Sequence, residues 1–286
     1  MNVDYDIAVV GGGPAGLSAA LSALRRDKKT VVFDQRGAKS KLAKAPLVDN
    51  YLGLPAISGQ ELMRVFSGHV KTRGIPILEE KIVNIYPGGG GFTLIAGDNA
   101  WQSASVVFAA GAPSGQTLPG ESDFLGRGVS YCAVCDGLLF RGKKVAIIAA
   151  TSGSREDTSF LAGLCREILY FPLYAGEHPQ HPNLKTLKEL PKEITGADTV
   201  GAIKTDKNSH AVDGVFIFRA NAPPDSILPD LALKDNFVRT DSLMRTNVPG
   251  FFAAGDCTGQ PWQISRATGQ GQIAALSAAS YIDGHN

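Results

Sequence analysis

The sequence predicts an α/β protein of two Rossmann-like three-layer domains, one inserted into the other. A short apolar strand followed by a turn, a helix and a second strand occurs twice, beginning at Tyr5 and again at Lys144. A strand ending in Gly-Asp (251–256) and a long helical pattern (263–281) follow and complete the first domain. The expected bounds are 1–114 with 245–286 for the discontinuous first domain and 115–244 for the insertion.

Composition excludes several classes of function. With 286 residues, 44% of them hydrophobic, the chain can bury two cores. A net charge of +1 gives no electrostatic reason to expect binding to nucleic acid or a membrane surface. No apolar run reaches the roughly 18 residues that span a bilayer, and the N-terminus lacks a signal-peptide pattern. We therefore expect a cytoplasmic protein.

The first turn has the pattern of a dinucleotide cradle. Gly11, Gly13 and Gly16 form Gly-x-Gly-x-x-Gly between the first strand and its helix. The first two glycines let the backbone approach a pyrophosphate, and the helix N-terminus stabilises its charge. Asp34 ends the second strand, where an acidic residue binds a ribose hydroxyl. Strand, helix and acid together predict a dinucleotide site.

Two of the four cysteines, Cys132 and Cys135, are separated by two residues. A single Cys-x-x-Cys pair is poor evidence for structural zinc, which needs four ligands, and the histidines supply no ligand set. We interpret the pair as redox-active and expect no metal. Cys257 is expected to be a small buried residue, and Cys165 a core residue on a helix.

Six motifs together resemble the low-molecular-weight, bacterial-type thioredoxin reductases. The resemblance extends from Asp6 to about Ile282, and its most specific parts are the cysteine motif and the closing Gly-Asp strand. The motifs are GGGPAG (11–16), NYLGLP (50–55), AAGA (109–112), LPGE (118–121), CAVCDG (132–137) and FAAGD (252–256).

This resemblance implies FAD as the cofactor and a homodimer formed through the FAD domains. It places Asp34 or its neighbours near the adenosine ribose, Asp256 at the ribityl chain, and the helix N-terminus at Gln263 at the flavin pyrimidine edge. The implied cofactor-binding residues are Gly11, Gly13, Pro14, Ala15, Gly16, Asp34, Gln35, Asn50, Ala110, Gly111, Gly255, Asp256, Gln263 and Ile264.

The resemblance also assigns roles at the cysteine motif. Cys135 would face the flavin, and Cys132 would be the interchange thiol that attacks the substrate disulfide. Asp136 would act as acid or base during exchange; its structural alternative is a helix N-cap.

The inserted domain lacks the features that bind NADPH in this family. Ala149, Thr151 and Ser154 stand where its turn should have glycines, and 172–174, after the next strand, contains no arginine for the 2′-phosphate. The resemblance therefore narrows to the ferredoxin-dependent flavin thioredoxin reductases. We expect reduced ferredoxin as electron donor and thioredoxin as acceptor. An iron–sulfur protein with a reduction potential near −400 mV can reduce the disulfide of a thioredoxin whose potential is near −270 mV.

A basic stretch, 25–44, is a candidate docking surface for an acidic ferredoxin, although it is equally consistent with a solvated loop. Three other functions remain open. They are an NADPH-dependent thioredoxin reductase with an altered nucleotide site, a flavin dithiol oxidase that uses oxygen, and a redox-sensing flavoprotein. Fast reoxidation of the flavin by air would distinguish the oxidase.

Overall fold

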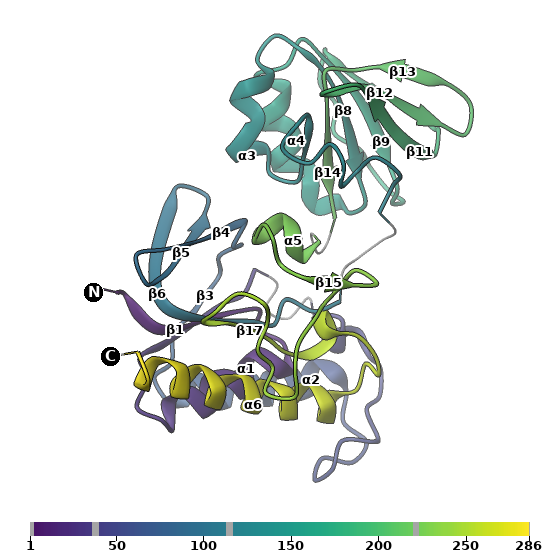
Figure 1. Ribbon diagram of the computed structural model, residues 1–286. Helices are drawn as coiled ribbons and strands as arrows, with labels where there is room; N and C mark the ends of the chain where they lie inside the picture. The colour runs from purple at the N-terminus through teal and green to yellow at the C-terminus, as the bar shows by residue number, and fades with distance from the viewer. Residues whose placement is uncertain (1–2, 36–39, 113–116, 220–222, 286) are drawn as a thin grey trace. The chain divides into compact units, whose positions relative to one another are not determined.

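The computed structural model describes residues 3–35, 40–112, 117–219 and 223–285. The chain divides into two compact units, shown in Figure 1. Unit 1 comprises 1–113 with 223–286, and unit 2 comprises 114–222. The second boundary lies well before the expected residue 245, because 224–244 pack within unit 1. There the short helix α5 (Pro224–Ile227) contacts strand β4 (Asn84–Gly88), and strand β16 (Phe237–Val238) contacts the 3₁₀ turn η5 (Gly255–Thr258). This segment has no strong periodicity that would have assigned it from sequence.

Unit 1 is built on a seven-stranded sheet in the order β3-β2-β1-β6-β5-β4, with β17 pairing β6. Strands β1, β2, β6 and β17 run parallel, whereas β4 and β5 form an antiparallel hairpin continued by β6. The strands are β1 Tyr5–Val10, β2 Thr30–Phe33, β3 Ile77–Leu78, β4 Asn84–Gly88, β5 Gly91–Ala96, β6 Asn99–Phe108 and β17 Phe251–Ala253; a small hairpin adds β15 Leu233–Lys234 and β16 Phe237–Val238.

Strand register aligns the predicted cofactor residues. Val10 pairs with Phe33 on one side and Phe108 on the other, and Phe108 pairs with Ala253. Four parallel strands therefore end at the same sheet edge, and the residues after each strand meet there. In open α/β sheets, ligands bind at this carboxyl edge.

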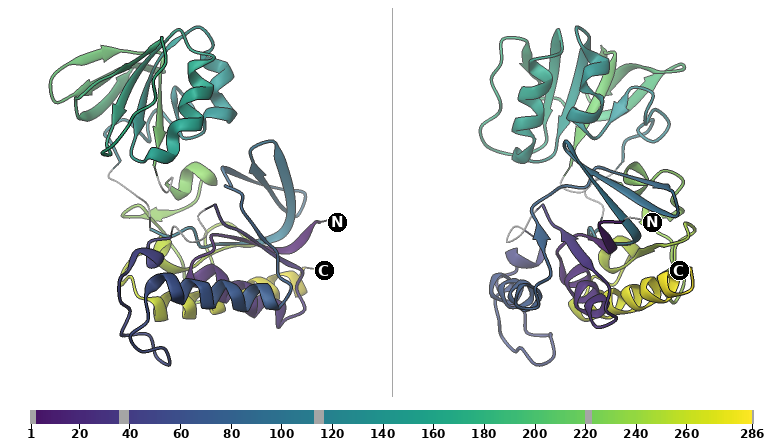
Figure 2. Two further views of the ribbon diagram at one scale, coloured as in Figure 1. Left: turned by 180° about the vertical axis from the view of Figure 1, so that it is seen from behind. Right: turned by 90° about the vertical axis from the view of Figure 1, so that its left-hand side faces the viewer.

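Three helices lie side by side on one face of this sheet (Figure 2). Helix α1 packs between α2 and α6, and small residues allow its close approach to α6. Ala19, Ala23, Ala274 and Ala278 are fully buried, and a Cβ at Gly271 would lie 2.0 Å from the Ala15 carbonyl oxygen. The helical elements of unit 1 are α1 Pro14–Leu24, η2 Leu42–Lys44, α2 Gly59–Thr72, α5 Pro224–Ile227, η5 Gly255–Thr258 and α6 Ile264–Asp283.

Unit 2 has three layers around a parallel sheet in the order β10-β9-β8-β14-β7. Alternate residues of β8 separate two cores. Ala146 and Ile148 pack toward the antiparallel sheet β11-β12-β13, and Val145 and Ile147 pack toward α3 and α4. Its elements are β7 Val129–Ser130, α3 Ala133–Asp136, η3 Gly137–Phe140, β8 Lys144–Ala149, η4 Ser152–Ser154, α4 Arg155–Ala162, β9 Glu167–Pro172, β10 Leu184–Thr186, β11 Pro191–Gly196, β12 Val200–Thr205, β13 Ser209–Ala211 and β14 Gly214–Phe218.

The predicted α/β architecture with two Rossmann-like units is confirmed. Cys165, expected on a helix, instead follows the end of α4 and is still buried. None of the helices in the described residues is long and apolar enough to span a membrane.

Candidate active site

The glycine turn after β1 has an open side and a crowded side. Gly11 has a φ of +113°, and a Cβ there would lie 2.3 Å from the Ala109 carbonyl oxygen. A Cβ at Gly16 would lie 1.8 Å from the Gly11 carbonyl oxygen, so these glycines let strand and helix pack closely. A Cβ at Gly13, by contrast, would meet no atom of the described residues within 4 Å. Space for a ligand therefore exists at Gly13.

The N-terminus of α1 opens into this space. Gly13 is the N-cap, Pro14 occupies the first turn, and no side chain of the described residues caps the helix. The first-turn amides of Ala15 and Gly16 thus lack a side-chain acceptor. Because that turn reads Pro-Ala-Gly and carries no charge, the helix end suits a pyrophosphate.

Asp34 follows β2 at the same edge and is partly buried, and its amide donates to the Leu78 carbonyl at 2.9 Å. A Cβ at Gly12 would lie 2.4 Å from Asp34 Oδ2, so the carboxylate rests against the glycine turn. Gln35 is exposed beside it. This is the location expected for a carboxylate that binds a ribose.

The residues after β6 and β17 complete the edge. Ala110 and Gly111 follow β6, and Gly255 (φ +81°) would place a Cβ 2.8 Å from the Ala15 Cβ. The Gly255 amide donates to Gln270 Oε1 at 2.9 Å. Three chain segments that are distant in sequence thus meet at one place.

Asp256 lies in η5 and is partly buried. Burial raises the pKa of its carboxyl group above the usual value, although the positive charges of Lys41 and Arg266 act in the opposite direction. A polar ligand that hydrogen-bonds this carboxylate would compensate for its desolvation.

The N-terminus of α6 is a second open helix end. Gln263 is its N-cap, Ile264 is its first residue, and no side chain of the described residues caps it. Asn50 Nδ2 donates to Gln263 Oε1 at 3.1 Å, which joins the 50–55 motif to this helix end. With its two open helix termini, open glycine turn and two carboxylates, the edge fits FAD.

In unit 2, Cys132 and Cys135 form a disulfide with a Cα–Cα distance of 5.4 Å. Cys132 is the N-cap of α3, and its Sγ accepts a hydrogen bond from the Cys135 amide at 3.2 Å. The free thiols Cys165 and Cys257 are buried, and burial raises their pKa to about 11 and about 12, respectively. Only the predicted pair therefore has the surroundings of a reactive site.

Asp136 does not act as the helix cap that its position allows. It is the N-cap residue of η3, but within the described chain its side chain makes no capping hydrogen bond. Its Oδ2 instead accepts from the Ser130 hydroxyl at 2.6 Å. The carboxylate is thus held toward β7 and the start of the cysteine motif.

A buried ion pair next to this motif was missed by sequence reasoning. Glu121 is fully buried and pairs with Arg219, whose side chain is 6% exposed. The Tyr131 hydroxyl donates to Glu121 Oε1 at 2.7 Å, and the Leu118 amide donates to Oε2 at 2.9 Å. The signal available in sequence was the LPGE motif, but nothing local indicates its partner Arg219, 98 residues away.

We call the second turn, 149–154, closed because side chains occupy the positions that are glycine in the first turn, although Ser152 and Gly153 between them are exposed. Ser154 is 2% exposed, and its hydroxyl donates to the Thr151 carbonyl at 2.9 Å. The Thr158 hydroxyl in turn donates to the Ser154 carbonyl at 2.7 Å. After β9, the Tyr174 side chain contacts Tyr170 of that strand, and their hydroxyl oxygens are 3.0 Å apart.

Known proteins of one family are similar to this chain over most of its length. The chain matches the pyridine nucleotide-disulphide oxidoreductase family over residues 5–168 and 183–271. It is 34% identical over 304 residues to the thioredoxin reductase of Treponema pallidum (strain Nichols), in an alignment that covers 99% of each chain. Among solved structures, it resembles a ferredoxin-flavin thioredoxin reductase from Clostridium acetobutylicum, with 38% identity, a TM-score of 0.87 and 98% of each chain covered. A thioredoxin reductase from Gloeobacter violaceus is 27% identical with a TM-score of 0.78, covering 99% of this chain and 96% of that one.

The chain belongs to the pyridine nucleotide-disulphide oxidoreductase family. Within it, the protein is a disulfide oxidoreductase of the thioredoxin reductase type, a flavoenzyme with FAD as its cofactor. The resemblance inferred from the six sequence motifs is confirmed.

Proposed function

We propose that this enzyme passes electrons from a reduced ferredoxin through FAD and the Cys132–Cys135 pair to the disulfide of a thioredoxin. The observation that carries the proposal is the closed second turn, because a family member that cannot bind a nicotinamide dinucleotide needs another donor. The similarity to the Clostridium acetobutylicum ferredoxin-flavin thioredoxin reductase supports the same donor.

Thr151 and Ser154 of the second turn are hydrogen-bonded to one another. The Ser154 amide and hydroxyl both point to the Thr151 carbonyl, at 3.4 and 2.9 Å. Glu156 and Asp157 occupy the first turn of α4, where they disfavour the approach of a phosphate. A pyrophosphate at this helix end would meet side chains and like charge.

The 2′-phosphate of NADPH would also lack its usual partner. The sequence after β9 places Leu173 and Tyr174 where a guanidinium group would grip the phosphate. Arg155 lies on α4 and is engaged by Glu177, donating to its carbonyl at 3.0 Å and lying 3.9 Å from its carboxylate. A charge-assisted bidentate contact is therefore missing from this site.

The cysteine pair would perform two successive exchanges. The Asp136 carboxylate takes the proton of the Cys132 thiol, and the resulting thiolate attacks one sulfur of the thioredoxin disulfide. Asp136 then gives this proton to the leaving thiolate. The Cys135 thiolate then attacks Cys132 Sγ, releases the second thioredoxin sulfur, which takes a proton from solvent, and restores the enzyme disulfide. Thioredoxin gains two electrons and two protons. FAD supplies the conversion of single electrons from ferredoxin into the pair that reduces the enzyme disulfide.

The cofactor roles follow the same assignment. Gly11, Gly13 and Gly16 would hold the pyrophosphate, Asp34 the ribose, and Asp256 the ribityl chain. The residues proposed to line the rest of the cofactor are Pro14, Ala15, Gln35, Asn50, Ala110, Gly111, Gly255, Gln263 and Ile264.

The docking surface for ferredoxin would include Lys41 and Lys44, both exposed beside the FAD edge. Lys41 Nζ lies 5.6 Å from the centre of the Trp262 ring, next to the open end of α6. Arg36 and Lys39 of the same basic stretch lie outside the described residues. The Lys41→Glu/Lys44→Glu variant should slow ferredoxin oxidation and flatten its salt dependence, whereas Lys71→Glu on α2 should do neither. Unchanged salt dependence in the double variant would exclude this surface.

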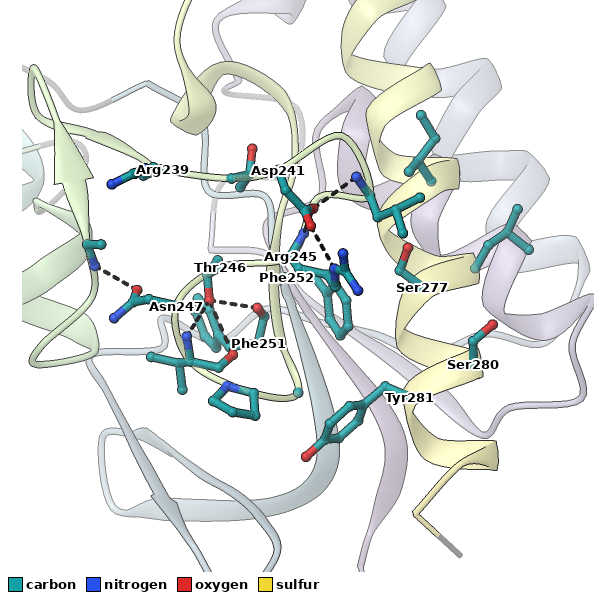
Figure 3. Close-up of a pocket in the computed structure, with 18 residues that line it drawn as sticks. Arg239, Asp241, Arg245, Thr246, Asn247, Phe251, Phe252, Ser277, Ser280 and Tyr281 are labelled. Atoms are coloured by element: carbon teal, nitrogen blue, oxygen red, sulfur yellow. Dashed lines mark hydrogen bonds and ion pairs between the residues drawn. The ribbon is translucent and has the colours of Figure 1, made fainter.

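A homodimer through unit 1 would cover an apolar hollow. The hollow of about 1190 Å³ lies between α6 and the segment 239–252 (Figure 3). Leu243, Ile273 and Leu276 line it and are 46%, 37% and 39% exposed. Leu276→Asp should convert a dimer to a monomer by light scattering, whereas Val65→Asp, equally exposed on α2, should not. A monomeric wild-type protein would exclude this assembly.

The function is tested by thioredoxin thiol formation in anaerobic turnover with two donors. With ferredoxin reduced photochemically, thiols should accumulate; with NADPH alone, they should not. Cys132→Ser should abolish the reaction with ferredoxin, and Cys257→Ala should leave it intact. Rapid oxygen consumption with dithiol substrates would favour the oxidase alternative instead, and turnover with NADPH would overturn the choice of donor.

A further inference from the structure

Ser130 lies at the junction between the sheet of unit 2 and the redox motif. It ends β7, is 3% exposed, and pairs with Phe216 in the parallel strand β14. Its hydroxyl oxygen lies 3.1 Å from the Cys132 amide nitrogen, 3.1 Å from the Cys132 carbonyl oxygen and 2.6 Å from Asp136 Oδ2. One buried hydroxyl thus contacts both the interchange cysteine and the neighbouring carboxylate.

The direction of these hydrogen bonds is determined by counting protons. The Cys132 amide can only donate, so Ser130 Oγ accepts from it. The hydroxyl has a single proton, and the Asp136 carboxylate is both closer and a stronger acceptor than the Cys132 carbonyl. The chain therefore runs from the Cys132 amide to Ser130 and then to Asp136.

This arrangement explains why Asp136 does not cap η3. Its backbone stands at the cap position, but its carboxylate is drawn to a hydroxyl whose strand is fixed by pairing with β14. Ser130 Oγ, bonded at once to the Cys132 amide and to Asp136, ties the carboxylate to the backbone of the attacking cysteine.

We propose that Ser130 is a positioning residue that holds the Asp136 carboxylate in register with Cys132 for proton transfer during disulfide exchange. The inference rests on the proposed acid–base role of Asp136. Ser130 itself neither reacts nor transfers the proton. It acts by restricting where the carboxylate can stand.

The test uses holoenzyme reduced with dithionite and then mixed anaerobically with oxidised thioredoxin, so that no physiological donor is involved. Ser130→Ala should lower the exchange rate about tenfold at unchanged apparent KM, and Asp136→Ala about a hundredfold. Ser130→Thr, which keeps the hydroxyl, should restore most of the rate. In the Asp136→Ala background, Ser130→Ala should have no further effect, because the two residues act through one carboxylate.

A second readout does not depend on activity. Hydrogen exchange of the Cys132 amide in the oxidised protein should accelerate in Ser130→Ala and return toward wild type in Ser130→Thr. Ser159→Ala removes a serine hydroxyl of the same unit that contacts His181 at 3.1 Å, and it should alter neither readout. If Ser130→Ala does not fold, Asp136→Glu takes its place. This variant keeps the carboxylate but displaces it from Ser130, and its exchange rate should be as low as the rate expected for Ser130→Ala.

The outcomes separate this inference from the proposed function. If reduced wild-type enzyme does not reduce thioredoxin, the proposed function is wrong. If wild type reacts but Ser130→Ala reacts equally fast, Ser130 does not position Asp136 and the inference is overturned. The same holds if the double variant loses the full rate reductions of Ser130→Ala and Asp136→Ala combined.

Discussion

The two turns that lead from β1 in unit 1 and from β8 in unit 2 into a helix occupy equivalent places and differ in their side chains. At Gly13 of unit 1 a side chain would meet open space, whereas its counterpart in unit 2 is Thr151, whose carbonyl accepts from the buried Ser154 hydroxyl. The topology of a nucleotide site is thus retained in both units, but only the first turn has glycines where the backbone must approach a pyrophosphate.

Charge reinforces this difference. Helix α1 begins with uncharged residues, whereas α4 begins with Glu156 and Asp157. A helix N-terminus attracts phosphate only when its amides are accessible and no carboxylate already occupies its field. A Rossmann-like fold therefore indicates where a nucleotide could bind, and the side chains of the turn decide whether it does.

The largest effect on cofactor binding is expected from placing a carboxylate in the open turn. Gly13→Asp should lower FAD affinity at least about a hundredfold, ~3 kcal/mol, because it puts negative charge beside the pyrophosphate without a steric clash. The flavin-to-protein ratio after purification measures this. The matched variant Gly153→Asp, at an exposed position of the second turn, should retain full flavin; equal losses of flavin in both variants would contradict the assignment of the two turns.

Breaking the buried ion pair of unit 2 should have the largest effect on folding stability. Glu121→Ala removes the carboxylate that pairs with the buried Arg219 guanidinium and should destabilise unit 2 by about 3–5 kcal/mol. Hydrogen exchange should show the loss in unit 2 while unit 1 remains protected. Asp241→Ala, which breaks the exposed pair with Arg245 in unit 1, should cost about 1 kcal/mol or less.

Opening the second turn should have a smaller effect. Thr151→Gly/Ser154→Gly should not by itself permit reduction by NADPH, since the phosphate would still lack a guanidinium partner. Adding Leu173→Arg and Tyr174→Arg should give weak binding, with a Kd of about 1 mM by calorimetry. If the double variant Thr151→Gly/Ser154→Gly were reduced by NADPH, the missing arginines would not be what prevents binding of the dinucleotide.

The two free cysteines should show the smallest effect. Their raised pKa values, about 11 for Cys165 and about 12 for Cys257, keep both thiols protonated in the folded protein. Because each folded value lies above that of an unfolded thiol, their contribution to stability is complete below about pH 8.5 and is lost as pH rises through 11 to 12. Iodoacetamide at pH 8 should label neither cysteine by mass spectrometry; rapid labelling of native protein would disprove their burial.

Much of the fold and of the cofactor edge could be predicted from the sequence because its signals are local. Gly11, Gly16 and Gly255 are required by the conformation or the close packing of turns that directly follow β1 and β17, and Gly13 leaves space for a ligand in the same motif. The contact between Asn50 and Gln263 could not be derived this way, since it joins residues 213 apart. Asn50 and Gln263 were assigned to the site only through the resemblance to the thioredoxin reductases.

The misplaced domain boundary and the missed polar networks share one cause. Residues 224–244 form short elements whose assignment depends on packing against β4 and η5, not on their own periodicity. Ser130 and Arg219 are likewise unremarkable in sequence, and their importance comes from partners that only the folded unit brings near them. Tertiary contacts of single polar residues leave no periodic signal.

The most direct test of the difference between the two turns is an anaerobic titration of the flavin absorbance, with NADPH and reduced ferredoxin in parallel. The account predicts that ferredoxin bleaches the flavin, that oxidised thioredoxin restores it, and that NADPH leaves it unchanged. Bleaching by NADPH at a comparable rate would contradict the account, because the closed turn at 149–154 would then bind the dinucleotide after all.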